Sequence, residues 1–256
     1  MFEMMKYLIM AATVFFIMPV IGCSERLNLA EITTRAITAT TEVQSYRAST
    51  IETYTVDGKT GKSTYESEFA APDRLHVKVI NGDNWSESIF IGDRAYLRCS
   101  DIPQWCESPC EYVDPSSGAT VGVQATLIPL EKELEPLHWL VDLDRLPDEE
   151  IDSVNCWHYM GRVDMDSYAD MLQEMAKKED ERIAQHSTEY LENMRRGMIS
   201  FELWVEKDSH VIRQLKSERR FTVFDPNTGQ EKLFAQSTTK RLYDFNQPTS
   251  IEPPQT

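Results

Sequence analysis

The chain has 256 residues, with 42 acidic and 26 basic side chains and a formal net charge of −16 at pH 7. This acidic excess argues against nucleic acid or an anionic membrane surface as the main binding partner. The length allows one domain with a well-buried core.

The first 22 residues have the pattern of a lipoprotein signal peptide. Lys6 precedes an apolar run from Tyr7 to Ile21, which is shorter than the ~18–20 residues that a membrane-spanning helix needs. Val20 and Gly22 supply the aliphatic and small residues expected before a lipid-modified cysteine, here Cys23. We therefore expect residues 1–22 to be removed and Cys23 to become a mature N-terminus that carries diacylglycerol. A plain signal peptide or a signal anchor is the alternative.

Residues 23–256 are expected to form a single exported domain that begins with an amphipathic helix. Its apolar residues recur at three- and four-residue steps, which places them on one helical face; they are Leu29, Ile32, Ala36, Ile37 and Val43. From Tyr46 to Cys99 apolar and polar residues alternate instead. Asp57-Gly58, Asn81-Gly82-Asp83 and Gly92-Asp93 separate these runs, so short antiparallel strands joined by tight turns are expected.

The second half of the chain predicts loops, short helices and further strands. Residues 100–126 are rich in Pro, Ser and Gly and are expected to be mostly loop. The leucine-rich stretch Leu127–Leu146 is interrupted by prolines, which predicts short helices. A strand is expected over Cys156–Val163, and a long charged helix over about 167–197, where Ser167 and Asp170 resemble a capping box and Gly197 supplies a stop. Three strands close the chain.

These elements predict one α+β domain, in which a large antiparallel sheet has its helices gathered on one face. Alternation along the strands selects candidate residues for an apolar cavity beneath the helices. From the strands these are Val77, Val79, Ile89, Phe201, Leu203 and Val205, and from the proline-broken lid they are Leu134, Leu137, Trp139 and Leu140.

Four cysteines remain once Cys23 is lipidated, namely Cys99, Cys106, Cys110 and Cys156. In an oxidising compartment an even number predicts two disulfides, with three connectivities to choose from. Cys99 closes a strand and Cys106 follows a tight return, which favours Cys99–Cys106 with Cys110–Cys156. A zinc site that includes His158 is the alternative, but export and the absence of CxxC pairs weigh against it.

The sequence offers no motif for catalysis. The five histidines are scattered without HExxH spacing, and no GxSxG nucleophile motif is present. Acidic pairs such as Asp142 with Asp144 lack the pattern of a calcium loop. We therefore expect a protein that is not an enzyme and that has no cofactor and no metal. An exported hydrolase is the weakest alternative.

Several short segments carry a resemblance to a known group of proteins. They are the cleavage pattern ending at Cys23, the helix before Tyr46, Ala71-Pro72-Asp73-Arg74, Leu146–Asp152, Cys156-Trp157-His158-Tyr159, Phe201–Glu206 and Tyr243–Pro248. Together they resemble the LolA/LolB-like superfamily, nearest to its LppX/LprG-type lipoproteins. The resemblance spans nearly all of the mature chain, although Ser153 stands where the family often has glycine.

The resemblance implies a half-open antiparallel β-barrel whose concave face is covered by helices. In this family the cavity between sheet and helices holds the acyl chains of lipids or lipoproteins. We therefore expect an exported lipoprotein, held at the cell membrane or outer membrane through Cys23, that binds a lipid or acylated ligand. The alternative is an envelope sensor that binds another envelope protein through the same fold.

Overall fold

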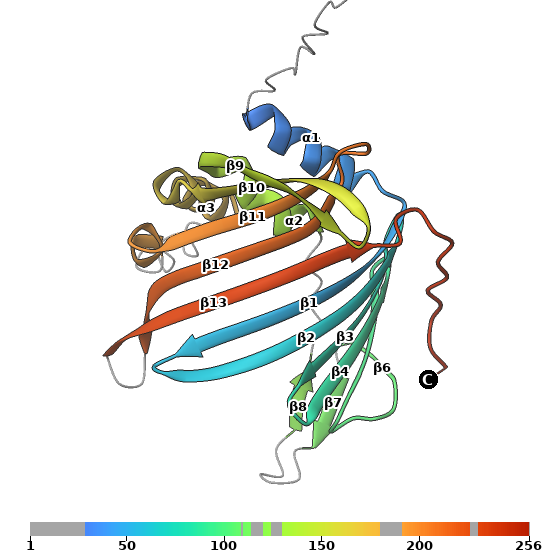
Figure 1. Cartoon of the computed structure of the whole chain (residues 1–256). Coiled ribbons are helices and arrows are strands. Elements are labelled where there is room, and N and C mark those ends of the chain that lie inside the picture. Colours follow the sequence, from blue (N-terminus) through green and yellow to red (C-terminus); the bar gives the residue numbers. More distant parts are fainter. Residues whose placement is uncertain are drawn as a thin grey trace, which may run out of the picture.

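The computed structural model describes residues 29–108, 110–113, 120–123, 130–179, 191–225 and 230–255 (Figure 1). The expected signal peptide and Cys23 lie outside these residues, so the lipid anchor stays a prediction. None of the helices in the described part is both long and apolar enough to cross a membrane.

The domain is built on one large antiparallel sheet that curves strongly and does not close (Figure 1). Its 11 strands lie in the order β6-β5-β4-β3-β2-β1-β13-β12-β11-β10-β9. They are β1 (Ser45–Val56), β2 (Lys59–Ala70), β3 (Arg74–Asn81), β4 (Asn84–Ile91), β5 (Arg94–Cys99), β6 (Cys106–Glu107), β9 (Leu140–Ile151), β10 (Val154–Val163), β11 (Met198–Glu206), β12 (Ile212–Asp225) and β13 (Gln230–Tyr243). A separate pair consists of β7 (Cys110–Val113) and β8 (Thr120–Val123).

Tight turns set the register of the first five strands, as the sequence predicts. Asp57 and Gly58 both have positive φ, 50° and 74°, which is the geometry of the type I′ turn that matches the twist of a hairpin. Gly82 and Gly92 also have positive φ, at 61° and 60°. Glycine adopts this conformation without steric cost. Gly82 therefore suits the tight turn between β3 and β4, and Gly92 suits the tight turn between β4 and β5.

The labelled helices of the described part lie against one face of the sheet, over the half that contains β9–β12 (Figure 1). They are α1 (Leu29–Thr41), α2 (Leu130–Leu134), the 3-10 helix η1 (Glu135–Trp139) and α3 (Met165–Glu179). The helical part of the leucine-rich stretch ends at Trp139, because β9 begins at Leu140. Pro147 is accommodated in β9 because this strand forms an edge of the sheet and is bulged at that point.

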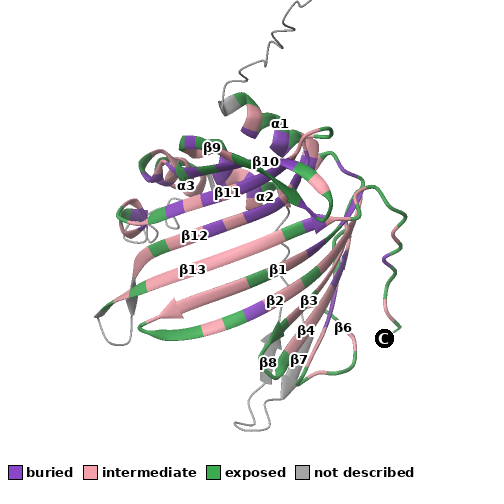
Figure 2. Ribbon diagram, in the orientation of Figure 1, coloured by how far each residue is buried: buried purple, intermediate pink, exposed green. Residues whose placement is uncertain are grey.

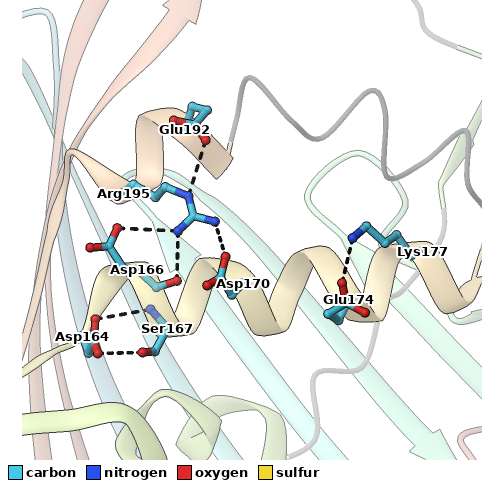
Figure 3. Close-up of polar contacts among 8 residues, drawn as sticks. All are labelled: Asp164, Asp166, Ser167, Asp170, Glu174, Lys177, Glu192 and Arg195. Atoms are coloured by element: carbon cyan, nitrogen blue, oxygen red, sulfur yellow. Dashed lines mark hydrogen bonds and ion pairs between the residues drawn. The ribbon is translucent and has the colours of Figure 1, made fainter.

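The prediction of one helix over about 167–197 is wrong. Arg195 lies in a helical segment, residues 191–195, that runs beside α3 (Figure 3). Its guanidinium contacts the carboxylates of Asp166 at 3.5 Å and Asp170 at 2.5 Å. In an unbroken helix residues 166 and 195 would be about 43 Å apart, so one continuous helix cannot contain both.

The predicted capping box also takes a different form. Asp164 precedes α3 and accepts hydrogen bonds from the Ser167 backbone N–H at 3.3 Å and from the Ser167 hydroxyl at 2.7 Å (Figure 3). These hydrogen bonds hold the pKa of Asp164 below its usual value. The N-cap is therefore Asp164 and not Ser167.

The core lies between the helices and the sheet. Residues from α1, α2, η1, α3 and strands β10–β13 form one cluster of buried side chains, in which Phe201, Leu137 and Leu203 are 2%, 1% and 1% exposed. Figure 2 shows the buried positions concentrated on β10–β12 and the helices, while β13, β1 and β2 are mostly intermediate or exposed. One half of the sheet is therefore tightly packed and the other is more open.

Replacement of Leu137 by alanine tests this core. Because the side chain is fully buried, Leu137→Ala should lower the free energy of unfolding by about 2–5 kcal/mol, measured by urea denaturation. Leu233→Ala is the matched control, because Leu233 is 64% exposed, and it should change stability by less than about 0.5 kcal/mol. Equal losses in the two variants would contradict the packing described here.

Candidate functional site

We call the face of the sheet that packs against the helices the inner face. Ala48 on β1, Leu242 on β13 and Leu203 on β11 belong to the buried cluster beneath the helices. Because side chains alternate along each strand, the register then assigns every second residue of the neighbouring strands to this face. The remaining residues define the outer face.

Most of the predicted lining and lid residues lie together in the packed core. Phe201, Leu203 and Val205 come from the inner face of β11, and Leu134 and Leu137 come from α2 and η1. All five are at most 2% exposed, while Trp139 and Leu140 are partly buried against the same cluster. In this arrangement these side chains fill the space between helices and sheet themselves.

Val77 and Val79 lie on the inner face in the more open half of the sheet. They oppose Ser67 and Tyr65 of β2, which share the inner face with Phe69 and Tyr46. Both valines are only half-buried. An apolar inner surface therefore continues from the packed core onto β2 and β3 with less cover.

Ile89 does not belong to this surface, so its assignment to the cavity is wrong. It opposes His76, whereas inner-facing Val77 opposes Ser88, and a shift of one residue reverses the face. Ile89 packs on the outer face in a small cluster with Tyr96 and Ile251. The C-terminal tail is held there by a 2.7 Å hydrogen bond from Arg74 to the Ile251 carbonyl.

The inner face also carries polar residues, which the apolar pattern of the sequence does not identify. Lys240 opposes Leu215 on β12 and Thr50 on β1, and its side chain is 12% exposed. Its ammonium group forms a close ion pair with Glu133 of α2, so this pair attaches the short helix to β13. Burial, and secondly the charge of Glu133, raise the pKa of Tyr46 well above its usual value. Alternation with Leu242 was the signal that could have placed Lys240 inside.

Two further rows of inner-face residues are mostly polar. Register places Ser217, Thr238, Glu52 and Ser63 in one row and Arg219, Gln236, Tyr54 and Gly61 in the next. The Tyr54 ring lies across Gly61, so close that a Cβ there would be 2.3 Å from it. Partial burial, and then the Glu52 charge, raise the pKa of Tyr65 in the adjoining row. The inner face is thus apolar near the core and polar farther along the strands.

The preferred disulfide pairing is wrong, because Cys99 and Cys156 are both free thiols. The return after β5 places Cys106 opposite Leu97, two residues before Cys99. Cys156 is fully buried on the outer face beside Trp204 and Ile151. Cys106 is disulfide-bonded, while the side chain of Cys110 lies outside the described residues.

The alternative zinc site has no support in the described part of the chain, where no three His, Cys, Asp or Glu side chains gather to hold a metal. His158, its expected histidine, lies on the outer face and stacks on Trp204 with ring centroids 4.3 Å apart. Its two ring nitrogens are each 3.3 Å from a carboxylate, of Glu149 and Glu202.

The outer face has a shallow hollow of about 350 Å³ at the turn between β3 and β4. Its wall includes Glu87, which accepts hydrogen bonds from His76 and Arg98, each at 2.7 Å. Although partial burial opposes it, these hydrogen bonds lower the pKa of Glu87. Arg98 in turn lies over the rings of Trp85 and Trp105, at 5.7 and 4.6 Å from their centroids.

No protein-family model and no curated protein matches the chain, but several solved structures resemble it. The lipoprotein LppX of Mycobacterium tuberculosis is 11% identical over 88% of this chain and 98% of its own, with a TM-score of 0.46. A LolA superfamily protein from Nitrosomonas europaea is 10% identical over 86% and 93%, with a TM-score of 0.29. The MucA/MucB complex of Pseudomonas aeruginosa gives 13% identity over 82% and 56%, with a TM-score of 0.32.

These solved structures include the kinds of protein that the sequence resembles. At such low identities and TM-scores they carry no argument about a ligand. The function proposed below therefore rests on the geometry of this chain.

Loss of Glu133 should destabilise the protein mainly because it leaves the charge of Lys240 without a partner. Glu133→Gln leaves the mostly buried ammonium of Lys240 without a partner and should cost about 1–3 kcal/mol of unfolding free energy. The double variant Glu133→Gln with Lys240→Met should recover part of this loss, because it removes both charges. Glu174→Gln, at an exposed pair on α3, is the control and should cost less than about 0.5 kcal/mol. A double variant no more stable than the single one would contradict this prediction.

The Glu87 carboxylate, which accepts hydrogen bonds from His76 and Arg98 on the outer face, should make the stability of the protein depend on pH. The pKa of Glu87 is lower in the folded protein than the usual value of a glutamate. Its contribution to the free energy of unfolding is therefore present above the unfolded pKa and is lost as pH falls through the folded pKa. The urea midpoint of wild type should therefore fall between about pH 5 and pH 3. Glu87→Gln should show a smaller fall, whereas Glu66→Gln, at an exposed position, should follow the wild type. Identical slopes in wild type and Glu87→Gln would refute the assignment.

Proposed function

We propose that this protein is a membrane-anchored extracytoplasmic lipoprotein that binds the acyl chains of a lipid or of a lipoprotein without catalysis. The observation that carries the proposal is the apolar inner surface of β2 and β3, where Val77 and Val79 are half-buried next to the packed core. A partly enclosed apolar surface on the concave side of a curved sheet suits an apolar ligand.

The energetics of such binding need no charged or catalytic group. Transfer of one CH₂ group from water to an apolar site contributes ~0.8 kcal/mol, so an acyl chain supplies its own driving force. The absence of GxSxG and HExxH motifs supports binding without chemistry.

We assign α2 and η1 the role of a movable cover. Leu134 and Leu137 are the residues by which this cover enters the core, and the Glu133–Lys240 pair attaches it to β13. A ligand that extends from Val77 and Val79 toward Phe201 must displace these two leucines. Because α2 and η1 are only five residues each, they can move without disturbing the sheet ladder.

Attachment through Cys23 would keep the domain close to the membrane. Leu29, where α1 begins, is only six residues after Cys23 in the sequence, so an extended tether spans at most about 20 Å. This length favours a stationary receiver or holder of lipid over a mobile shuttle.

One observation favours the alternative, a sensor that binds another envelope protein through the same fold. The predicted lining residues Phe201, Leu203 and Val205 are already buried by other side chains of the chain. If α2 and η1 never move, no space for an acyl chain opens beneath them and the remaining surfaces would bind a protein partner.

Ligand analysis separates the two functions. The domain is produced in its natural host without Cys23, and extracted molecules are identified by mass spectrometry. Uptake of a fluorescent fatty acid is then measured. Co-purified acyl lipid together with saturable uptake supports the proposal, whereas neither lipid nor uptake favours the sensor.

Two adjacent residues provide a matched test of the binding surface. Val79→Asp places a charge on the half-buried inner face and should weaken fatty-acid binding at least about tenfold, because a desolvated carboxylate would face the acyl chain. Ile80→Asp makes the same change one residue away on the outer face, where Ile80 is 40% exposed, and should leave binding unchanged. Equal effects of the two variants on binding would argue against the inner face as the site.

A further inference from the structure

Arg219 places a positive charge on the inner face beyond the packed core. It lies on β12 four residues after Leu215, whose side chain belongs to the core, and so shares its face. Its cross-strand partners are Ile199 of β11, which is 4% exposed, and Gln236 of β13. Ile199 belongs to the buried cluster, which confirms that Arg219 faces inward.

The partly buried guanidinium of Arg219 has one donor without a partner in the described part of the protein. Its Nε atom is buried and has no hydrogen-bond partner, and no described carboxylate forms an ion pair with it. The neighbouring charges on the outer face differ, because Glu218 pairs with Lys216 at 3.6 Å and with Arg220 at 3.8 Å. A buried donor without a partner is unfavourable, and a ligand that accepts a hydrogen bond from Nε would remove this cost.

Lys240 is another inner-face cation and lies on β13 four residues after Gln236. It already has a partner in Glu133. Glu52 also faces inward, but β1 and β12 are two strands apart, a lateral separation of about 10 Å. The positive charge of Arg219 is therefore not neutralised by either of these inner-face residues.

We propose that Arg219 binds the anionic headgroup, a carboxylate or phosphate, of the acyl ligand. This inference rests on the proposed function and narrows it to anionic amphiphiles. Arginine matches both groups because its planar donors form two parallel charge-assisted hydrogen bonds. Ser217, Gln236 and Thr238 surround this position in register and offer further donors.

The arrangement of the inner face suits a ligand with one polar end. The headgroup lies in the row of Arg219 and Gln236, and the acyl chain extends across the sheet toward Tyr65 and Val79 of β2 and β3. β12 and β3 are four strands apart, about 19 Å along the sheet. An acyl chain of ordinary length has room on this path.

A pair of probes that differ only in charge tests this subsite. Dansyl-labelled undecanoic acid and its methyl ester are titrated against the domain lacking Cys23, with fluorescence as the readout. Arg219→Gln should weaken binding of the acid by roughly tenfold to a hundredfold, the range of charge-assisted hydrogen bonds, and change binding of the ester less than about threefold. Arg220→Gln, one residue away and outward-facing, should change neither.

Thermal unfolding keeps the test independent of a folding defect. Without ligand, Arg219→Gln should be at least as stable as wild type, because the substitution removes a partly buried charge whose Nε has no partner among the described residues. The acid should raise the melting temperature of wild type more than that of Arg219→Gln. Inorganic phosphate should not displace the bound acid if the acyl chain provides most of the affinity; full displacement would identify a free-anion site instead and overturn the headgroup assignment.

The remaining outcomes separate the two proposals. If wild type binds neither probe, acyl binding itself fails and the subsite with it. If wild type and Arg219→Gln bind acid and ester with the same relative affinities, acyl binding stands and the headgroup subsite is wrong.

Discussion

The pairing of the first and last long strands is the constraint on which the rest of the structure depends. β1 and β13 lie side by side at the centre of the sheet, in register from Arg47 opposite Tyr243 to Val56 opposite Phe234. The other nine strands of this sheet lie outward from the pair, β2–β6 on one side and β12–β9 on the other. The alternation that begins at Ala48 and Leu242 therefore decides which side chains meet the helices and which meet solvent.

Much of this arrangement is predictable from local signals. Asp57-Gly58, Gly82 and Gly92 mark turns by their conformational preferences, and the alternation along β11 marks a strand whose inner face is buried. α1 follows from the spacing of its apolar residues. The antiparallel sheet with helices on one face was thus expected, and the structure confirms it.

The remaining features depend on contacts between distant segments, which a pattern in one segment does not contain. The face of Ile89 is decided by its partner His76 and by Ile251 of the tail. The charged stretch after Asp164 has helical composition throughout, yet Arg195 folds back onto Asp166 and Asp170. A pattern of apolar residues does not identify Lys240 and Arg219, whereas strand alternation places both of them on the inner face.

The edge strand β9 has a consequence for how copies of the protein coexist. An open sheet offers unpaired backbone groups at its edge, and such edges tend to join with one another. In β9 the bulge, Pro147 and a series of acidic side chains, among them Asp142, Asp144 and Glu149, oppose this joining. Proteins tethered to one membrane meet at high local concentration. If the chain is held at a membrane through Cys23 as proposed, the β9 edge would be unsuited to pair with the edge of a neighbouring copy.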